Sequence, residues 1–214
     1  MLGRRNLVMP EQQTLTIQQA IDLGVEHHAA GRFPEAEGIY KQILLTDPNQ
    51  HTVLHYLGVI AYQTGRSEFA VDLITRSLAV DPDCATAHSN LGNVLQGLER
   101  LDEAAASYQK ALSITPDFAK AYSHLGDVLK KLGKPDEAID SYRKAIAIKP
   151  DFVEGRSNLG TALGSQGKLG EAVATYQDTL AIKPEYIKAW NNLKYTAKAF
   201  LFSEGGGIRE MIFS

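Results

Sequence analysis

Few residues in this sequence have the types and spacing that chemistry requires. His51 and His55 are four residues apart, and two histidines at that spacing on one helix face could ligate a metal ion. A metal site needs further ligands, and the sequence has no HExxH motif and no cluster of cysteines and histidines. The glycines at 205–207 lack the Gly-Lys-Ser/Thr that a phosphate loop needs. No Ser/His/Asp or Cys/His set is present, so we predict a chain that is not an enzyme, with no cofactor and no metal.

The acidic pairs and the cysteine also favour a structural interpretation. Asp102–Glu103 and Asp136–Glu137 stand at the start of predicted helices, where carboxylates stabilise the helix dipole, so we do not assign them as general acids. Cys84 is the only cysteine, which excludes an internal disulfide and favours a reducing, cytoplasmic location.

The elements that would position any site follow a strict period of 34 residues. We number each repeat from its first residue, at 17, 51, 85, 119 and 153. Position 8 is always glycine: Gly24, Gly58, Gly92, Gly126 and Gly160. Leucine precedes each glycine, alanine occupies position 20, and proline occupies position 32. Position 24 is Tyr40, Ile74, Tyr108, Tyr142 and Tyr176. A fixed period of this length indicates a stacked repeat.

Each repeat shows two helical patterns joined by a short turn. Two helices pack closely only where their side chains are small, which accounts for glycine at position 8 and alanine at position 20. Glycine at position 15 predicts the end of the first helix, with Glu99 as the exception. The proline ends the second helix, and the Asp or Asn after four of these prolines is expected to cap the next helix.

This pattern resembles the tetratricopeptide repeat (TPR) family over residues 17–186. The resemblance implies an all-α, right-handed superhelical solenoid of five helix-turn-helix repeats with a C-terminal capping helix. The predicted boundaries are a flexible arm at 1–13, a solenoid at 14–202 and a flexible tail at 203–214. Within the solenoid we place repeats at 17–50, 51–84, 85–118, 119–152 and 153–186, and the capping helix at 187–202. Asparagine at position 6 further resembles the repeats of O-linked N-acetylglucosamine transferases and their bacterial SPINDLY-like relatives.

Composition limits the partners. The net charge of −3 does not favour nucleic acid, and no apolar run has the length of a membrane span. The N-terminal stretch has no apolar core behind its arginines, so we do not read it as a secretory signal. At position 8 of the capping helix, Lys194 replaces the small residue, so we expect no partner helix there. Phe200 and Phe202 are expected to lie beyond the cap, where a second chain could cover them.

The first helices of stacked pairs line a concave groove, and positions 2, 5, 6, 9, 12 and 13 are expected to face it. Small hydroxyls and amides dominate the middle of this surface at positions 5 and 9, and an amide can both donate to and accept from a peptide main chain. The predicted peptide-binding residues are Tyr56, Asn90, Asn93, His124, Asp127, Asn158, Thr161, Asn192 and Tyr195.

Three functions remain open at this stage. The first is a scaffold that binds a protein or peptide partner, and the second is the substrate-recognition arm of a SPINDLY-like glycosyltransferase. The third is a module that self-assembles into a homo-oligomer through its C-terminal helix and tail.

Overall fold

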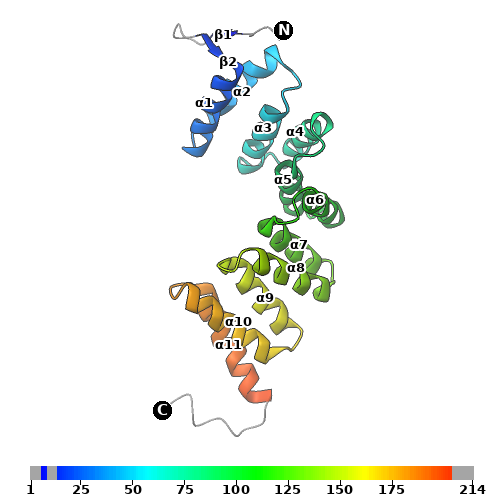
Figure 1. The fold of residues 1–214 in the computed structure, drawn as a ribbon, viewed down its shortest axis with the longest axis vertical. Coiled ribbons are helices and arrows are strands. Elements are labelled where there is room, and N and C mark those ends of the chain that lie inside the picture. Colours follow the sequence, from blue (N-terminus) through cyan, green and yellow to red (C-terminus); the bar gives the residue numbers. More distant parts are fainter. Residues whose placement is uncertain (1–5, 9–13, 204–214) are drawn as a thin grey trace. The chain divides into compact units, whose positions relative to one another are not determined.

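The structure is a computed structural model, and it describes residues 6–8 and 14–203 (Figure 1). The described part is all-α apart from one pair of three-residue strands. The strands are β1 (Asn6–Val8) and β2 (Thr14–Thr16). The helices are α1 (Ile17–Ala29), α2 (Phe33–Thr46), α3 (His51–Gln63), α4 (Ser67–Val80), α5 (Ala85–Gly97), α6 (Leu101–Ile114), α7 (Ala119–Lys131), α8 (Pro135–Ile148), α9 (Val153–Ser165), α10 (Leu169–Ile182) and α11 (Ile187–Ser203).

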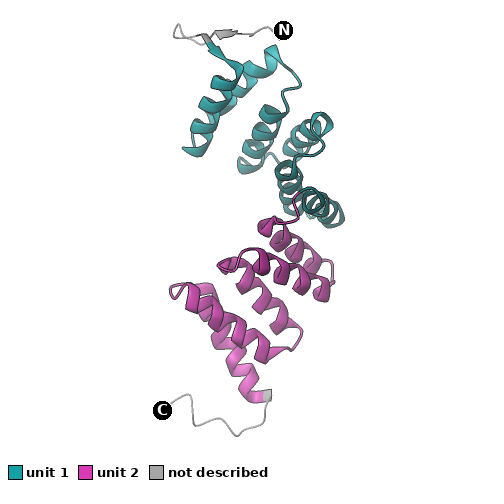
Figure 2. Cartoon of the chain, in the orientation of Figure 1, with its two compact units in different colours: residues 1–114 teal, residues 115–214 magenta. Residues whose placement is uncertain are grey.

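The chain divides into two compact units (Figure 2). Unit 1, residues 1–114, holds the two strands and the helix pairs α1–α2, α3–α4 and α5–α6. Unit 2, residues 115–214, holds α7–α8, α9–α10 and the single helix α11. Within each unit, consecutive helices pack on each other, and the first helices of neighbouring pairs also touch. Each unit therefore repeats one motif, and the fold class is an all-α solenoid.

Glycine at position 8 is required because an aromatic ring lies against the backbone there. Tyr108, Tyr142 and Tyr176 are buried, and each packs on the glycine sixteen residues before it. A Cβ atom at Gly92, Gly126 or Gly160 would lie 2.7 Å from the ring's Cε1 atom. Real Cβ contacts are essentially never this short, so the side chain at position 24 occupies the space that the missing Cβ leaves free. The low helix propensity of glycine is offset by burial of the ring.

The turns between paired helices need a left-handed residue at position 15. Gly31 and Gly65 in unit 1, and Gly133 and Gly167 in unit 2, have φ between 72° and 80°. Glu99 takes the same role in the third repeat with a φ of 57°. The turn that lacks glycine is thus made with the same geometry, at the steric cost that a side chain incurs in this region.

The predicted Asp and Asn caps are wrong. The N-caps of α3, α5, α7 and α9 are Gln50, Cys84, Phe118 and Phe152. Only the first of these makes a side-chain capping bond, in which Gln50 accepts from the backbone N–H of Thr52 at 3.0 Å. The aspartates lie one residue too early, in the turn after the proline. The backbone carbonyls of Asp117 and Asp151 accept from the N–H groups of Ala119 and Val153, but their side chains do not cap the helices.

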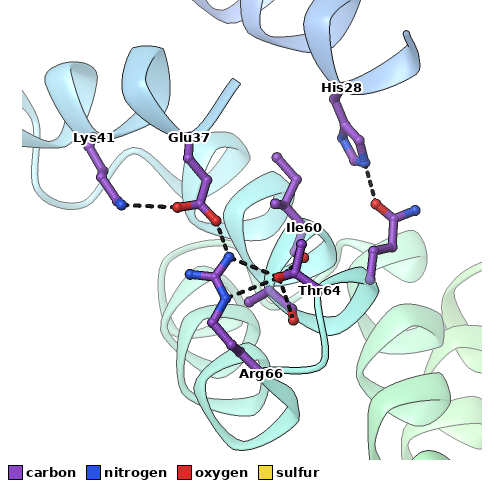
Figure 3. A network of polar contacts seen from close by, with 8 residues as sticks. His28, Glu37, Lys41, Ile60, Thr64 and Arg66 are labelled. Atoms are coloured by element: carbon purple, nitrogen blue, oxygen red, sulfur yellow. Dashed lines mark hydrogen bonds and ion pairs between the residues drawn. The ribbon is translucent and has the colours of Figure 1, made fainter. Parts of the chain in front are cut away.

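A basic residue at position 16 connects neighbouring repeats. In unit 1, Arg66 donates to Glu37, which also pairs with Lys41 at 3.0 Å (Figure 3). Arg100 lies 3.6 Å from Glu68 in the same way. Unit 2 repeats the contact between Lys168 and Asp136, at 3.9 Å. Apart from Glu37, these side chains are at least one-third exposed, so each exposed pair adds little stability, but together the pairs favour one register of stacking.

Both ends differ in part from the prediction. Asn6–Val8, inside the predicted flexible arm, forms β1 and pairs antiparallel with β2. Residues 204–214 of the predicted tail lie outside the described residues. Phe200 lies over α10, with its ring 3.5 Å from the place of a Cβ on Gly170, while Phe202 is exposed. None of the described helices combines the length and apolar character that crossing a membrane demands.

Candidate functional site

The predicted peptide-binding residues of unit 1 come from α3 and α5. The Asn90 amide donates to Nε2 of His55 at 2.8 Å, and Asn93 donates to the Asn90 side-chain oxygen at 3.5 Å. Tyr108 reaches the same place from the second helix of its repeat and donates its hydroxyl to Asn93 at 2.7 Å. Tyr56 is half-buried and stacks on His55, with ring centroids 5.7 Å apart. The structure therefore brings the three predicted residues of this unit into one surface.

In unit 2, Asp127 is the centre of the corresponding surface. Its carboxylate accepts from the Tyr142 hydroxyl at 2.7 Å and from the Asn158 amide at 3.3 Å. The oxygen of Asn158 in turn accepts from the Lys188 ammonium at 2.9 Å. His124, half-buried on α7, lies one helical turn before Asp127.

The same arrangement recurs one repeat later. Thr161 shares a hydrogen bond with the Tyr176 hydroxyl at 3.1 Å and accepts from the Asn192 amide at 3.2 Å. Tyr195, one turn further along α11, is 73% exposed. Of the six predicted residues of this unit, only Tyr195 thus presents a largely free side chain.

These contacts follow a rule that sequence reasoning missed. The tyrosine at position 24 bonds the polar side chain at position 9 of its own repeat, in Tyr108–Asn93, Tyr142–Asp127 and Tyr176–Thr161. In unit 2, asparagine at position 6 bonds position 9 of the preceding repeat. A signal was present in the sequence, because position 9 is polar in the third to fifth repeats and valine in the second, which has Ile74 at position 24. The first repeat departs from this rule, since it has Val25 at position 9 and Tyr40 at position 24.

The surface still has unused hydrogen-bonding capacity. An asparagine amide has two N–H donors, and Asn90 and Asn158 each use one of them in the contacts above. Asn192 bonds to both Thr161 and Tyr176. The serines at position 5 do not add to it, since Ser89, Ser123 and Ser157 are at most 4% exposed. The prediction that position 5 faces the groove is therefore wrong for these three repeats, because their side chains point between the helices.

The histidines of this surface are uncharged at neutral pH. Burial, and then the neighbouring His51, lowers the pKa of His55 to about 4. Burial also lowers the pKa of His124, against the opposing effect of Asp127. A neutral His55 can accept the Asn90 hydrogen bond, which a protonated ring could not. Among the described residues, no group of three or more His, Cys, Asp or Glu side chains could hold a metal ion.

Sequence reasoning also missed a pocket in the first repeat. It has a volume of about 470 Å³ and is lined by Val25, His28, Ala29, Gly31, Phe33 and Gln63. A second hollow, of about 320 Å³, lies on α11 around Trp190 and Lys194.

Stacked helix pairs with a polar face on their first helices define an α-solenoid repeat protein. Models of one family, described as tetratricopeptide repeat, match residues 83–151 in one case and residues 21–76 and 123–187 in another. The chain belongs to the tetratricopeptide repeat family.

Solved structures of similar fold include two that are described as TPR proteins, TTC0263 and YrrB. MamA is 29% identical, with a TM-score of 0.71 over 78% of this chain and 98% of that chain. TTC0263, a thermophilic TPR protein from Thermus thermophilus, is 24% identical, with a TM-score of 0.67 over 85% of this chain and 99% of that chain. YrrB is 19% identical, with a TM-score of 0.69 over 82% of this chain and 91% of that chain. The likeness to TTC0263 and YrrB concerns the fold alone. No curated protein matches the chain.

Proposed function

We propose that this protein is a non-catalytic scaffold that binds an extended peptide, or an extended segment of a partner protein, along the face lined by its first helices. One observation carries the proposal: half-buried asparagines stand at position 6 in the third repeat, the fifth repeat and α11, and each donates an amide hydrogen bond to the repeat before it. An amide has a second N–H, which Asn90 and Asn158 can offer to a ligand. In each unit, such amides can donate to and accept from the main chain of an extended ligand.

The neighbours are consistent with this function. YrrB is described as a TPR protein with an unusual peptide-binding site, and it shares the fold of this chain. Pre-organisation favours binding, because side chains already held by Tyr142 and Tyr176 lose little freedom when a ligand arrives.

Two other functions are weaker proposals. The resemblance of position 6 to O-GlcNAc transferase repeats has no support among the family matches and structures reported above. Self-assembly through the C-terminal helix rests on the exposure of Phe202 and Trp190 alone. A cytoplasmic location and the absence of nucleic-acid partners stay predictions.

A photo-cross-linking experiment tests the binding face. A photoreactive amino acid is placed at Glu154, at position 2 of α9, or at Gln177, on the second helix α10; both residues are exposed. A partner captured from the source cell should cross-link to the first variant and not to the second. Cross-linking only through position 177 would place the binding surface on the second helices and contradict the proposal.

A further inference from the structure

The pocket of the first repeat differs in chemistry from the rest of the proposed binding face. Its lining side chains come from α1, α2 and α3, all within unit 1, and none is a carboxylate, lysine or arginine. His28 closes one side, where its Nε2 is hydrogen-bonded to the side-chain oxygen of Gln63 at 2.8 Å (Figure 3). The pocket lining therefore has no carboxylate, lysine or arginine, and a hydrogen bond holds one of its walls in place.

Aromatic rings surround this wall. His28 packs edge-on against Phe33 and Tyr56, with centroids 5.8 and 6.2 Å apart. Behind them, Tyr56 stacks on Tyr40 with centroids 5.9 Å apart and planes within 10°. Aromatic groups bind one another favourably in edge-to-face and offset-stacked arrangements. A ring inserted beside Phe33 and His28 would extend a cluster that already has this geometry.

This repeat contains a buried hydroxyl group, that of Tyr40. The Tyr40 hydroxyl makes no hydrogen bond among the described residues, and its burial raises the pKa of Tyr40. The equivalent Tyr108 donates its hydroxyl to Asn93 and Gln96, at positions 9 and 12. In the first repeat these positions are Val25 and His28, and both line the pocket. An unsatisfied hydroxyl thus lies behind the pocket wall, at the place where other repeats have a polar contact.

Two carboxylates and one arginine lie near the pocket, so the net charge beside it is negative. Arg32, between the lining residues Gly31 and Phe33, donates its Nε–H to His27 at 2.9 Å. Asp22 and Glu26 are exposed on α1, one helical turn before and one residue after Val25. Asp22 accepts a hydrogen bond from Gln18 at 2.8 Å. Within residues 14–203, neither carboxylate forms an ion pair, which leaves both able to attract a basic group on a ligand.

We infer that this pocket anchors one aromatic side chain of the peptide ligand, and that a lysine or arginine neighbours this aromatic residue in the ligand. The inference rests on the proposed function and adds the chemistry of the ligand at one end of the binding face. The aromatic ring enters beside Phe33 and His28, and the basic group lies over Asp22 and Glu26.

The test uses the full chain and two-dimensional NMR with a defined probe, N-acetyl-phenylalanyl-lysine amide. We expect saturable shifts of the Val25, His28, Phe33 and Gln63 signals, with a Kd on the order of millimolar for so small a ligand. The matched probes are N-acetyl-alanyl-lysine amide and N-acetyl-phenylalanyl-glutamate amide, and each should bind at least about tenfold more weakly. No saturable shift up to about 20 mM, or equal shifts with the alanine probe, would overturn the inference.

The matched variant is Val25→Asn, which gives the first repeat the position-9 residue of the third. It offers Tyr40 a hydrogen-bond partner, so the chain should fold, and it makes the pocket polar, so the affinity for the probe should fall at least about tenfold. Unchanged affinity in this variant would show that the pocket is not the site. A parent that self-associates while Val25→Asn is monomeric would also overturn the inference, since a second copy would then occupy the pocket.

Failure here can be separated from failure of the proposed function. A partner could cross-link through position 154 and still bind the Val25→Asn variant with full affinity. That result would support the proposed peptide-binding face and contradict only the inference that the pocket binds an aromatic side chain.

Discussion

A Cβ atom on Gly126 would lie 2.7 Å from Cε1 of Tyr142, so the ring of one helix occupies the space of a side chain on the other. We predict that Gly126→Ala destabilises the protein by about 1–3 kcal/mol, despite the better helix propensity of alanine, because the ring or the helix must move. Urea denaturation measures this change. The control is Gly38→Ala in α2, where nothing lies within 4 Å of the new Cβ and the helix should gain about 0.5–1 kcal/mol. A Gly126→Ala chain as stable as the parent would contradict the packing account.

The tyrosine hydroxyls at position 24 should contribute differently to the free energy of unfolding in different repeats. Tyr142→Phe removes a hydrogen bond to a half-buried carboxylate, so we expect a loss of about 1–3 kcal/mol in the free energy of unfolding. Tyr40→Phe removes a hydroxyl that has no partner among the described residues, so stability should be unchanged or slightly higher. Thermal or chemical unfolding of the two variants, side by side, checks the comparison. Equal losses would show that Tyr40 has a partner after all.

The free energy of unfolding should decrease as the pH is lowered, because the folded protein keeps the His55 ring neutral. Its pKa is about 4 in the folded chain and about 6.5 in an unfolded one. The unfolded state therefore takes up the proton first, and stability is lost as the pH falls from about 6.5 towards 4. We expect about 1–2 kcal/mol of loss from this residue between pH 7 and pH 5.

His55→Gln is the control for this pH dependence. A glutamine side chain can still accept from Asn90 but does not titrate, so the variant should lose less stability between the same two pH values. His124 shifts in the same direction, and it remains in both proteins. An identical pH dependence in parent and variant would show that His55 is not the source.

Much of the fold could be predicted because the period repeats the same physical constraint five times. Glycine at position 8, alanine at position 20 and a large residue at position 24 pack together at one helix crossing. The same three positions recur in every repeat, so each repeat supports the interpretation of the others. The turn at Glu99 shows the limit, because stacking on both sides imposes a left-handed residue whether or not it is glycine.

The caps and the network at position 9 could not be predicted from single positions. Asp83, Asp117 and Asp151 are good capping residues by type, but the proline before them and the turn geometry place them one residue too early. The sequence predicts that Asn158 binds a peptide, and the structure shows that its amide group also bonds to Asp127 and Lys188 in its own chain. Contacts between repeats depend on the stacking distance, which the sequence does not contain.

The most direct test of the binding face uses the partner that the cross-linking experiment identifies. Its affinity is measured for the parent chain and for the double variant Asn90→Ala with Asn158→Ala. The two lost hydrogen bonds should weaken binding roughly ten- to a hundredfold, at about 0.5–1.5 kcal/mol each. The two substitutions also remove hydrogen bonds within the chain, which will lower the melting temperature modestly, so affinity is measured at a temperature where every variant is folded. The control variant is Gln177→Ala, which changes an exposed residue on a second helix. We predict the loss in the double variant and full affinity in the control. Unchanged affinity in the double variant would contradict the account and show that these asparagines only hold the repeats together.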